Sequence, residues 1–387
     1  MPTFQRPTLE LAEIVRRHGP RLESTLSGEQ RRILRDIVHC RTAALGGHVE
    51  SCDHCHHQRI AYNSCRNRHC PKCQGSAAAR WMADRAAELL PVEYFHVVFT
   101  LPDTFNALAL ANKRIVYGVL FDAVAQTLLE VAADPKRLGA RIGFIGILHT
   151  WGQNLSLHPH VHCIVPGGGI KPDGSTGLTA GGKWVNCRPG FFLPVRVLSK
   201  IFRGKFIDGL KHARGRGLLV GADDDRQFDQ LLDTAVKHDW VVYAKPPFGG
   251  PEQVLKYLAR YTHRIAISNR RLVSVDYQSV SFNYKDYAHG NRPRTMTLDG
   301  GGFLRRFLMH AVPTGFMRIR HFGLLANRVR AKNLALCRRL MSAPPQAGCP
   351  TIGTTQACPI CQCGRMISGP NLDPMQLRRL LIRLDSS

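Results

Sequence analysis

The pattern of apolar and polar residues along the chain predicts strands in its central part and helices around them. Three short segments are apolar and rich in strand-favouring residues, at 94–100, 141–148 and 157–165. The short link 151–156 between the last two predicts a β-hairpin. Helical periodicity or helix-favouring composition is found in the segments 1–38, 76–92, 105–133, 193–214, 226–238 and 251–263.

Beyond residue 264 the pattern changes to short strands separated by Asn, Gly and Asp turns. Because strands alternate with long helices, we expect an α+β fold with a mainly antiparallel sheet flanked by helices. We divide the chain into three parts. Residues 1–92 form a helical lead-in and a small cysteine-rich domain, residues 93–342 form the α+β domain with a basic extension, and residues 343–387 form a linker and a cysteine-containing tail.

The length of 387 residues suits two or three domains, and the apolar content of 44% is enough for ordinary cores. The longest apolar stretch, 115–133, is interrupted by Asp122, Gln126 and Glu130, so we expect no transmembrane helix. The first residues lack the apolar core of a signal peptide. We therefore expect a cytoplasmic protein without a membrane partner, in which cysteines serve as metal ligands before they form disulfides.

The formal net charge is +25, and the charge is unevenly distributed. Between Asp299 and Asp373 there is no acidic residue, whereas the same stretch contains ten Lys and Arg residues. A solubilising surface does not require such a one-sided bias. The charge therefore indicates a polyanionic partner, and we expect nucleic acid.

Two C-x2-C motifs lie in the cysteine-rich segment. Cys52 and Cys55 form the first, Cys70 and Cys73 form the second, and fourteen residues separate the two motifs. Each motif places two thiolates on one tight turn, with the spacing that tetrahedral zinc requires. We predict a structural Zn²⁺ site formed by these four cysteines. Three more potential ligands remain in this segment, namely Cys40, Cys65 and His69. They form part of a second zinc site, or the two cysteines are plain buried thiols.

Cations surround the second motif. A loop that is stiffened by zinc and carries positive charges suits contacts with phosphates, so we predict DNA contacts from Arg66, Arg68 and Lys72.

A third C-x2-C motif, Cys358 to Cys361, lies in the tail and looks like half of a zinc ribbon. A complete site needs a second pair of ligands, and the possible complements are Cys337, Cys349 and Cys363. The alternative is that these are surface thiols of a flexible tail.

Three histidines occupy alternate positions of the predicted strand 157–165, namely His158, His160 and His162. Side chains of a strand alternate between its faces, so all three imidazoles point the same way. A single histidine on a strand is usually a core or surface residue, but this pattern predicts a metal site. A third ligand is required, and Gln153, His149 and His158 are the candidates. A Gln or carboxylate ligand suits Mg²⁺ or Mn²⁺, whereas three histidines favour zinc.

Two tyrosines, Tyr257 and Tyr261, lie four residues apart on a predicted helix and therefore share one face. They are either an aromatic pair in a core or nucleophiles that attack phosphates. Cations in the same segment favour the second interpretation, because a phenol with a pKa of about 10 needs activation by positive charge or a metal. These cations, which we also expect to contact DNA, are Lys256, Arg260 and Arg264.

The order of these motifs resembles the rolling-circle transposases of the insertion-sequence ninety-one family. The resemblance covers about residues 10–340, and its most specific segments are 64–73, 149–162, 257–261 and 318–327. It implies an N-terminal zinc-binding domain and a catalytic domain of the HUH-endonuclease type, named for a His-hydrophobic-His motif. It also implies nicking and rejoining of single-stranded DNA at element ends and target through 5′-phosphotyrosine intermediates.

The resemblance assigns roles to individual residues. His160 and His162 would hold a catalytic Mg²⁺ or Mn²⁺ ion, and Tyr257 and Tyr261 would be the nucleophiles. Gln153 is our choice for the third ligand, because related enzymes often place a polar ligand close upstream of the histidine pair. His158 would then support the ligands or contact DNA. The matching basic segment adds two expected DNA contacts, Arg318 and Arg320.

Two other functions are compatible with parts of the sequence. A non-enzymatic zinc-finger DNA-binding regulator would explain the charge and the cysteines, but not the alternating histidines or the paired tyrosines. A zinc metallohydrolase that uses His158, His160 and His162 would need a catalytic carboxylate. No Asp or Glu occurs between Asp134 and Asp173, which argues against this second alternative.

Overall fold

The chain folds into two compact units that are each built from separate parts of the sequence. The first unit comprises residues 1–79, 265–311 and 350–387, and the second comprises 80–264 and 312–349. This division differs from the sequential one expected above, because 265–311 and the tail belong with the N-terminal segment. The computed structural model describes residues 9–73, 81, 84–86, 88–172, 182–245, 266–342 and 356–385.

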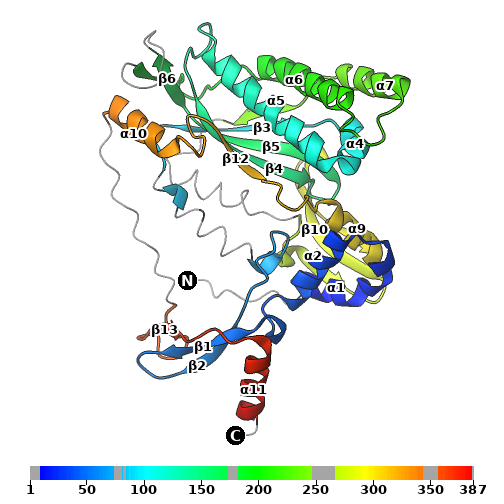
Figure 1. Ribbon diagram of the computed structural model, residues 1–387, viewed down its shortest axis with the longest axis vertical. Helices are drawn as coiled ribbons and strands as arrows, with labels where there is room; N and C mark the ends of the chain where they lie inside the picture. The colour runs from blue at the N-terminus through cyan, green and yellow to red at the C-terminus, as the bar shows by residue number, and fades with distance from the viewer. Residues whose placement is uncertain are drawn as a thin grey trace. The chain divides into compact units, whose positions relative to one another are not determined.

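The second unit is built on a five-stranded sheet with the strand order β12-β4-β5-β3-β8, in which every neighbouring pair is antiparallel (Figure 1). The predicted hairpin is confirmed, and the Gly152 N–H donates to the Ser156 carbonyl at 2.9 Å in its turn. The strands are β3 (Tyr94–Thr100), β4 (Gly143–Trp151), β5 (Leu157–Pro166), β8 (Val242–Lys245) and β12 (Ile319–Gly323).

Helices cover one face of this sheet, and a short hairpin extends the unit. In Figure 1 the long helices α5 and α6 lie across the strands. The expected α+β class with an antiparallel sheet is therefore confirmed. The helices of this face are η3 (Asp103–Phe105), α4 (Asn106–Ala111), α5 (Lys113–Ala133), α6 (Val195–Gly215) and α7 (Asp225–Val236). Helix α10 (Arg330–Leu340) packs in a separate cluster with Ile170 and Leu324, and the hairpin joins β6 (Gly168–Pro172) to β7 (Gly182–Asn186).

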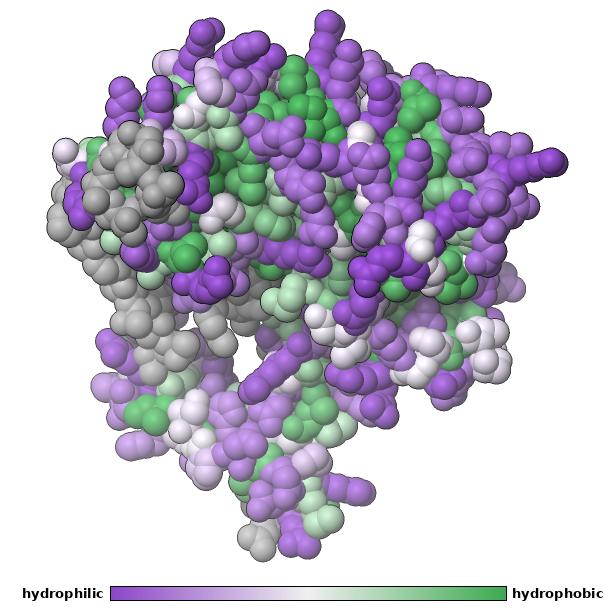
Figure 2. Space-filling model, turned by 45° about the horizontal axis from the view of Figure 1, so that its top comes forward, coloured by the Kyte–Doolittle hydropathy of each residue, from purple (hydrophilic) through white to green (hydrophobic). Residues whose placement is uncertain are grey.

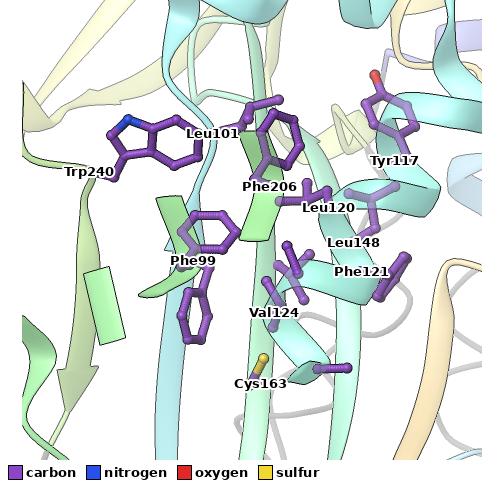
Figure 3. Close-up of a cluster of buried hydrophobic side chains, with 14 of the residues drawn as sticks. Phe99, Leu101, Tyr117, Leu120, Phe121, Val124, Leu148, Cys163, Phe206 and Trp240 are labelled. Atoms are coloured by element: carbon purple, nitrogen blue, oxygen red, sulfur yellow. The ribbon is translucent and has the colours of Figure 1, made fainter. Parts of the chain in front are cut away.

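The main core lies between the sheet and α5, α6 and α7. Alternate strand residues such as Val97, Phe99 and Val161 point into it, because side chains of a strand alternate between the two faces. Figure 3 shows Phe99, Leu148 and Cys163 from the strands packed with Phe121 and Val124 of α5. The opposite face of the sheet carries the intervening residues, and these include the histidines.

Helix α5 is mostly apolar and buries most of its surface in the core, while Asp122, Gln126 and Glu130 form a narrow exposed stripe. It is long and apolar enough to cross a membrane by length and composition alone, and 61% of its most apolar window is buried inside the protein. Such burial is typical of a core helix.

Outside the core, the face seen in Figure 2 is mainly hydrophilic, with apolar side chains in small separate groups.

The first unit contains two three-stranded antiparallel sheets, with the orders β13-β1-β2 and β11-β10-β9. Its elements are α1 (Leu11–His18), η1 (Pro20–Thr25), α2 (Gly28–His39), η2 (Ala43–Leu45), β1 (Gly47–Cys52), β2 (Gln58–Tyr62), η4 (Asn269–Arg271), β9 (Leu272–Val275), β10 (Ser279–Asp286), η5 (Tyr287–His289), β11 (Arg292–Asp299), α9 (Gly300–Met309), β13 (Met366–Ser368) and α11 (Pro374–Asp385).

Specific contacts join residues 266–311 to the N-terminal helices. The Leu11 N–H donates to the Asn269 side-chain oxygen at 3.1 Å. Helix α1 packs on α9, and a Cβ atom added at Gly300 would lie 2.1 Å from Nδ1 of His18. This close approach requires glycine at the start of α9. These contacts explain why the two segments form one unit although about 250 residues separate them in sequence.

Candidate functional site

Three histidines converge on the face of the five-stranded sheet that is opposite α5 and α6. His149 lies on β4, and His160 and His162 lie on β5, with His149 paired to His160 in the strand register. One ring nitrogen from each of the three lies within 4.8 Å of the others. The ring centroids of His160 and His162 are 4.8 Å apart, and those of His149 and His162 are 4.5 Å apart. We call these three residues the histidine cluster.

Hydrogen bonds determine which ring nitrogens are available for a metal. Nδ1 of His160 is 2.6 Å from the carbonyl oxygen of His158. A carbonyl only accepts, so Nδ1 carries the proton and Nε2 keeps its lone pair. Nδ1 of His162 is 2.7 Å from Nε2 of His96, and a proton on Nδ1 there also leaves Nε2 of His162 as the metal-binding nitrogen.

His96 is a supporting residue that our sequence reasoning missed. It lies on β3, is 6% exposed, and stacks on His162 with the ring centroids 5.0 Å apart. Burial, together with the charge of Lys245, lowers the pKa of His96 to about 4, so its ring is neutral near pH 7 and can accept the proton of His162. The only signal in the sequence is its position in the strand pattern of 94–100, which gives no indication of the register.

His149 is held by its surroundings on β4. Its ring stacks on Trp151 at 4.7 Å, and its side chain is 3% exposed. His149 is the last residue of β4 in the regular register with β5, directly opposite His160, and the register shifts only beyond it, between His149 and Trp151. Residues directly opposite each other on neighbouring strands lie on the same face, so the strand pairing itself brings His149 to the other two histidines.

His149 is the third histidine that the structure brings to the pair, and Gln153 as a ligand stays a prediction. Gln153 lies in the turn between β4 and β5, and our choice of it rested on family resemblance. His158 is exposed, and its ring centroid is 5.1 Å from that of His160. His158 is outside the group of three whose nitrogens converge, although its backbone carbonyl orients His160.

The donor set of the cluster fits a divalent transition metal. Imidazole nitrogens suit Zn²⁺, Fe²⁺ or Ni²⁺, whereas Mg²⁺ prefers oxygen ligands. No carboxylate joins the three histidines within the part of the chain that the structure describes. Three protein ligands would leave positions open for water or a phosphate oxygen. The three imidazoles by themselves suit a transition metal better than Mg²⁺, and the identity of the ion stays a prediction.

The predicted nucleophiles Tyr257 and Tyr261 lie outside the described residues, as do Lys256, Arg260 and Arg264. The last described residue before them is Lys245, at the end of β8. In the strand register Lys245 is paired with His96, the residue that supports the cluster.

The predicted zinc quartet of Cys52, Cys55, Cys70 and Cys73 does not form. Cys70 and Cys73 converge instead with Cys40 and Cys65, with Sγ of Cys73 3.5 Å from each of the latter two. Cys40 directly follows the end of α2 and lies next to Cys70 and Cys73. Cys52 is the last residue of β1 and lies in the other group of cysteines. The correct first cluster is therefore Cys40, Cys65, Cys70 and Cys73.

This first cluster fits structural zinc. Four thiolates at about 2.3 Å from a tetrahedral zinc ion are about 3.8 Å apart, close to the observed separations. Hydrogen bonds among the four thiols lower the pKa of Cys40 and Cys73 and raise the pKa of Cys65 and Cys70, as expected of sulfur atoms this close together. His69, which we considered as a further ligand, is outside the group, and its backbone N–H donates to Oδ1 of Asn67 at 2.9 Å. Cys52 and Cys55 belong to a second cluster with Cys358 and Cys361.

Two of the predicted DNA contacts have partners within the protein. Lys72 Nζ forms an ion pair with Glu10 at 2.6 Å. The Arg320 guanidinium lies 4.3 Å from the Phe121 ring centroid, on the face of the sheet opposite the histidines, and burial lowers its pKa. These contacts give both side chains structural roles.

Arg66 is exposed and adopts a left-handed conformation with φ of 52°. Arg68 is partly buried, as is Arg318. The Arg318 carbonyl accepts from Leu148 N–H at 2.8 Å, and this bond continues the pairing of β12 with β4. Among these three, Arg66 is best placed to meet a phosphate.

Comparisons with known proteins agree with this arrangement. A family described as "Putative transposase" matches residues 143–333, which include the histidine cluster, and a "Transposase zinc-binding domain" matches residues 14–101. The chain is 51% identical over 382 residues to "Putative transposase y4qJ" of Sinorhizobium fredii, covering 93% of this chain and 94% of the relative. No solved structure matches it.

A second relative is the "Transposase for insertion sequence element IS801" of Pseudomonas savastanoi pv. phaseolicola. It is 30% identical over 296 residues, which cover 76% of this chain and 69% of the relative. The matched ranges contain the first zinc cluster and the histidine cluster, so both sites lie in segments shared with transposases. The chain therefore belongs to the insertion-sequence ninety-one family of transposases, and its partner is DNA.

Proposed function

We propose that this transposase nicks and rejoins single-stranded DNA through a 5′-phosphotyrosine link to Tyr257 or Tyr261. The observation that carries the proposal is the histidine cluster, and the sequence adds two tyrosines and several cations at 256–264. A metal site alone would suit many functions. A metal site in a protein whose sequence also contains two tyrosines among several cations suits phosphoryl transfer.

His149, His160 and His162 are the residues that would hold the divalent ion. When bound there, such an ion polarises the scissile phosphate and stabilises the negative charge of the transition state. The protein contributes by orienting the ligands before the ion and DNA arrive. The carbonyl of His158 and the ring of His96 keep the protons on the outer nitrogens, so the inner lone pairs need no rearrangement.

The tyrosines would carry out the strand transfer. The phenolic oxygen forms a bond to phosphorus, the bond from phosphorus to the 3′ oxygen breaks, and the phenol's proton leaves as the 3′ oxygen gains one. Nearby Lys256, Arg260 and Arg264 would favour the phenolate. Attack by a 3′-OH on the phosphotyrosine reverses the step and rejoins DNA. Two tyrosines would allow two strands to be handled in turn.

A cleavage assay tests this mechanism. Single-stranded oligonucleotides that span the ends of the element are labelled on the 5′ or 3′ side and incubated with protein and Mn²⁺. We expect the 3′-side label to become covalently attached to the wild-type protein, and this adduct to disappear when Tyr257→Phe and Tyr261→Phe are combined. Tyr277→Phe is the control, because Tyr277 is 74% exposed in the turn between β9 and β10.

An adduct formed by the double variant would contradict the assignment of the nucleophiles. The alternative of a DNA-binding regulator is favoured by the two cysteine clusters and the charge of +25. It predicts that the wild-type protein binds the oligonucleotides but never forms an adduct with any divalent metal. The same assay therefore separates the two functions.

A further inference from the structure

We propose that Cys52, Cys55, Cys358 and Cys361 bind a zinc ion that fixes the C-terminal segment to the N-terminal zinc-binding domain. We call these four residues the tail cluster. The zinc-binding family match ends at residue 101 and the transposase match at residue 333, so Cys358 and Cys361 lie outside both. The proposal is independent of the cleavage chemistry and stands on the first unit alone.

The sulfur positions fit one shared metal ion. All four Sγ atoms lie within 4.8 Å of one another. Cys52 and Cys361 are 3.7 Å apart, and Cys55 and Cys358 are 3.6 Å apart. These separations are close to the distance of about 3.8 Å between thiolates on tetrahedral zinc. They are much longer than the bond of about 2.05 Å in a disulfide.

The two cysteine turns have the same backbone conformation. The His56 N–H donates to the Cys52 carbonyl at 3.2 Å, and the Gln362 N–H donates to the Cys358 carbonyl at 3.1 Å. His56 has a φ of 57° and Gln362 a φ of 56°. A left-handed conformation is unfavourable for residues with a side chain. Its presence at the same place in both turns indicates a geometric requirement that both turns share.

Backbone N–H groups point at the sulfur atoms from both turns. Such donors stabilise the thiolate form that a metal requires. The donors are His54 and Cys55 to Cys52 Sγ, Ile360 to Cys358 Sγ, and Gly364 to Cys361 Sγ, each at 3.4 Å.

The two cysteine turns also contact each other through hydrogen bonds and a close approach at Gly364. The Arg365 N–H donates to Asp53 Oδ1 at 2.7 Å, and the Asp53 N–H donates to the Arg365 carbonyl at 3.1 Å. A Cβ atom at Gly364 would lie 2.5 Å from Cys52 Sγ, so only glycine fits at this position. The tail motif is therefore complementary to the N-terminal motif in detail, although more than 300 residues separate them.

The metal would add to the hydrogen bonds that hold the tail, which include two between Gly47 and Leu372 and one from the Gly369 N–H to the Val49 carbonyl. Strand β13 adds only three residues to β1, with Cys52 paired to Met366 (Figure 1). Met366 is buried beside Cys52 and Cys358, and Leu377 of α11 is fully buried. A strand of three residues is weak by itself. Metal binding contributes its free energy directly to folding in small domains of this kind.

Zinc is the metal that we infer, although four thiolates also bind iron. Cys52 and Cys55 lie within the range that matches a transposase zinc-binding domain. An iron site of this type absorbs visible light and changes its oxidation state, whereas zinc does neither. A coloured, redox-active protein whose colour is lost with Cys358 would overturn the assignment to zinc.

The first test is the metal content of the purified full-length protein. We expect the combined change Cys358→Ser and Cys361→Ser to lower zinc by one ion per chain relative to wild type. Cys363→Ser is the matched control, because Cys363 is an exposed cysteine in the same segment but outside the tail cluster. An equal zinc content in wild type and the double variant would refute the site.

The second test uses the wild-type protein and remains valid if the variant fails to fold. Iodoacetamide is added to the zinc-loaded protein, and the labelled cysteines are identified by mass spectrometry. Cys363 should react at least tenfold faster than Cys358 and Cys361, and a chelator should remove this difference. Equal rates for the three cysteines in the zinc-loaded protein would overturn the proposal.

Discussion

At the scale of single residues, the alternating histidines were the strongest signal in the sequence. His160 and His162 could be predicted to share a face because the alternation of a strand is a local property. His149 was one of three candidates for the third ligand that the sequence left open, and the support by His96 was not predicted. His149 lies opposite His160 in the pairing of β4 with β5, and His96 meets His162 through the register of β3 on β5. A short motif does not specify the register between strands.

His96 allows a test of the support that we describe. We expect His96→Ala to weaken Mn²⁺ or Zn²⁺ binding at the histidine cluster by about 10- to 100-fold, because the proton on His162 Nδ1 loses its acceptor. His96→Gln should retain part of the affinity, since the amide oxygen can accept. Metal titration calorimetry measures the affinities. His289→Ala is the control, because His289 is exposed and pairs with Asp286 in the first unit.

At the scale of elements, local patterns predicted most of the second unit. The expected segments 193–214 and 226–238 correspond to α6 and α7, and 157–165 corresponds to β5. Local apolar periodicity is sufficient for such elements because each buries one face against a single core. The pairing of β13 with β1 was not predictable. A three-residue strand carries no periodicity, and its partner lies more than 300 residues away.

The junction of α1 and α9 gives a prediction at this scale. Gly28 and Gly300 each begin a helix directly after a capping residue, Ser27 and Asp299. A Cβ at Gly28 meets nothing within 4 Å, whereas a Cβ at Gly300 collides with the buried ring of His18. We expect Gly300→Ala to lower the free energy of unfolding by about 1–3 kcal/mol.

The matched change Gly28→Ala should leave that free energy unchanged or raise it by less than about 1 kcal/mol, because alanine reduces the entropy of the unfolded chain. Urea denaturation of the two variants and the wild type gives the comparison. A similar loss of stability in both variants would show that the close approach to His18 is not the cause.

At the scale of the whole molecule, the sequence predicted a DNA partner from charge, but it could not show which cations are available. The net charge of +25 gives only the excess of positive over negative side chains. Folding then pairs some of them internally, as Lys72 pairs with Glu10 and Arg320 packs on Phe121. The effective charge toward DNA depends on the cations that remain exposed.

The salt dependence of DNA binding separates these two groups of cations. Each phosphate that the protein neutralises on a single strand contributes about −0.7 to the slope of log K against log salt concentration. Arg66 is exposed, so we expect Arg66→Gln to make the slope less negative by about that amount. Lys72→Gln should leave the slope unchanged, because the ion pair with Glu10 already compensates that charge. Fluorescence anisotropy with a labelled single strand at several salt concentrations gives both slopes. If Lys72→Gln changes the slope as much as Arg66→Gln does, the ion pair opens on DNA and Lys72 contacts a phosphate after all.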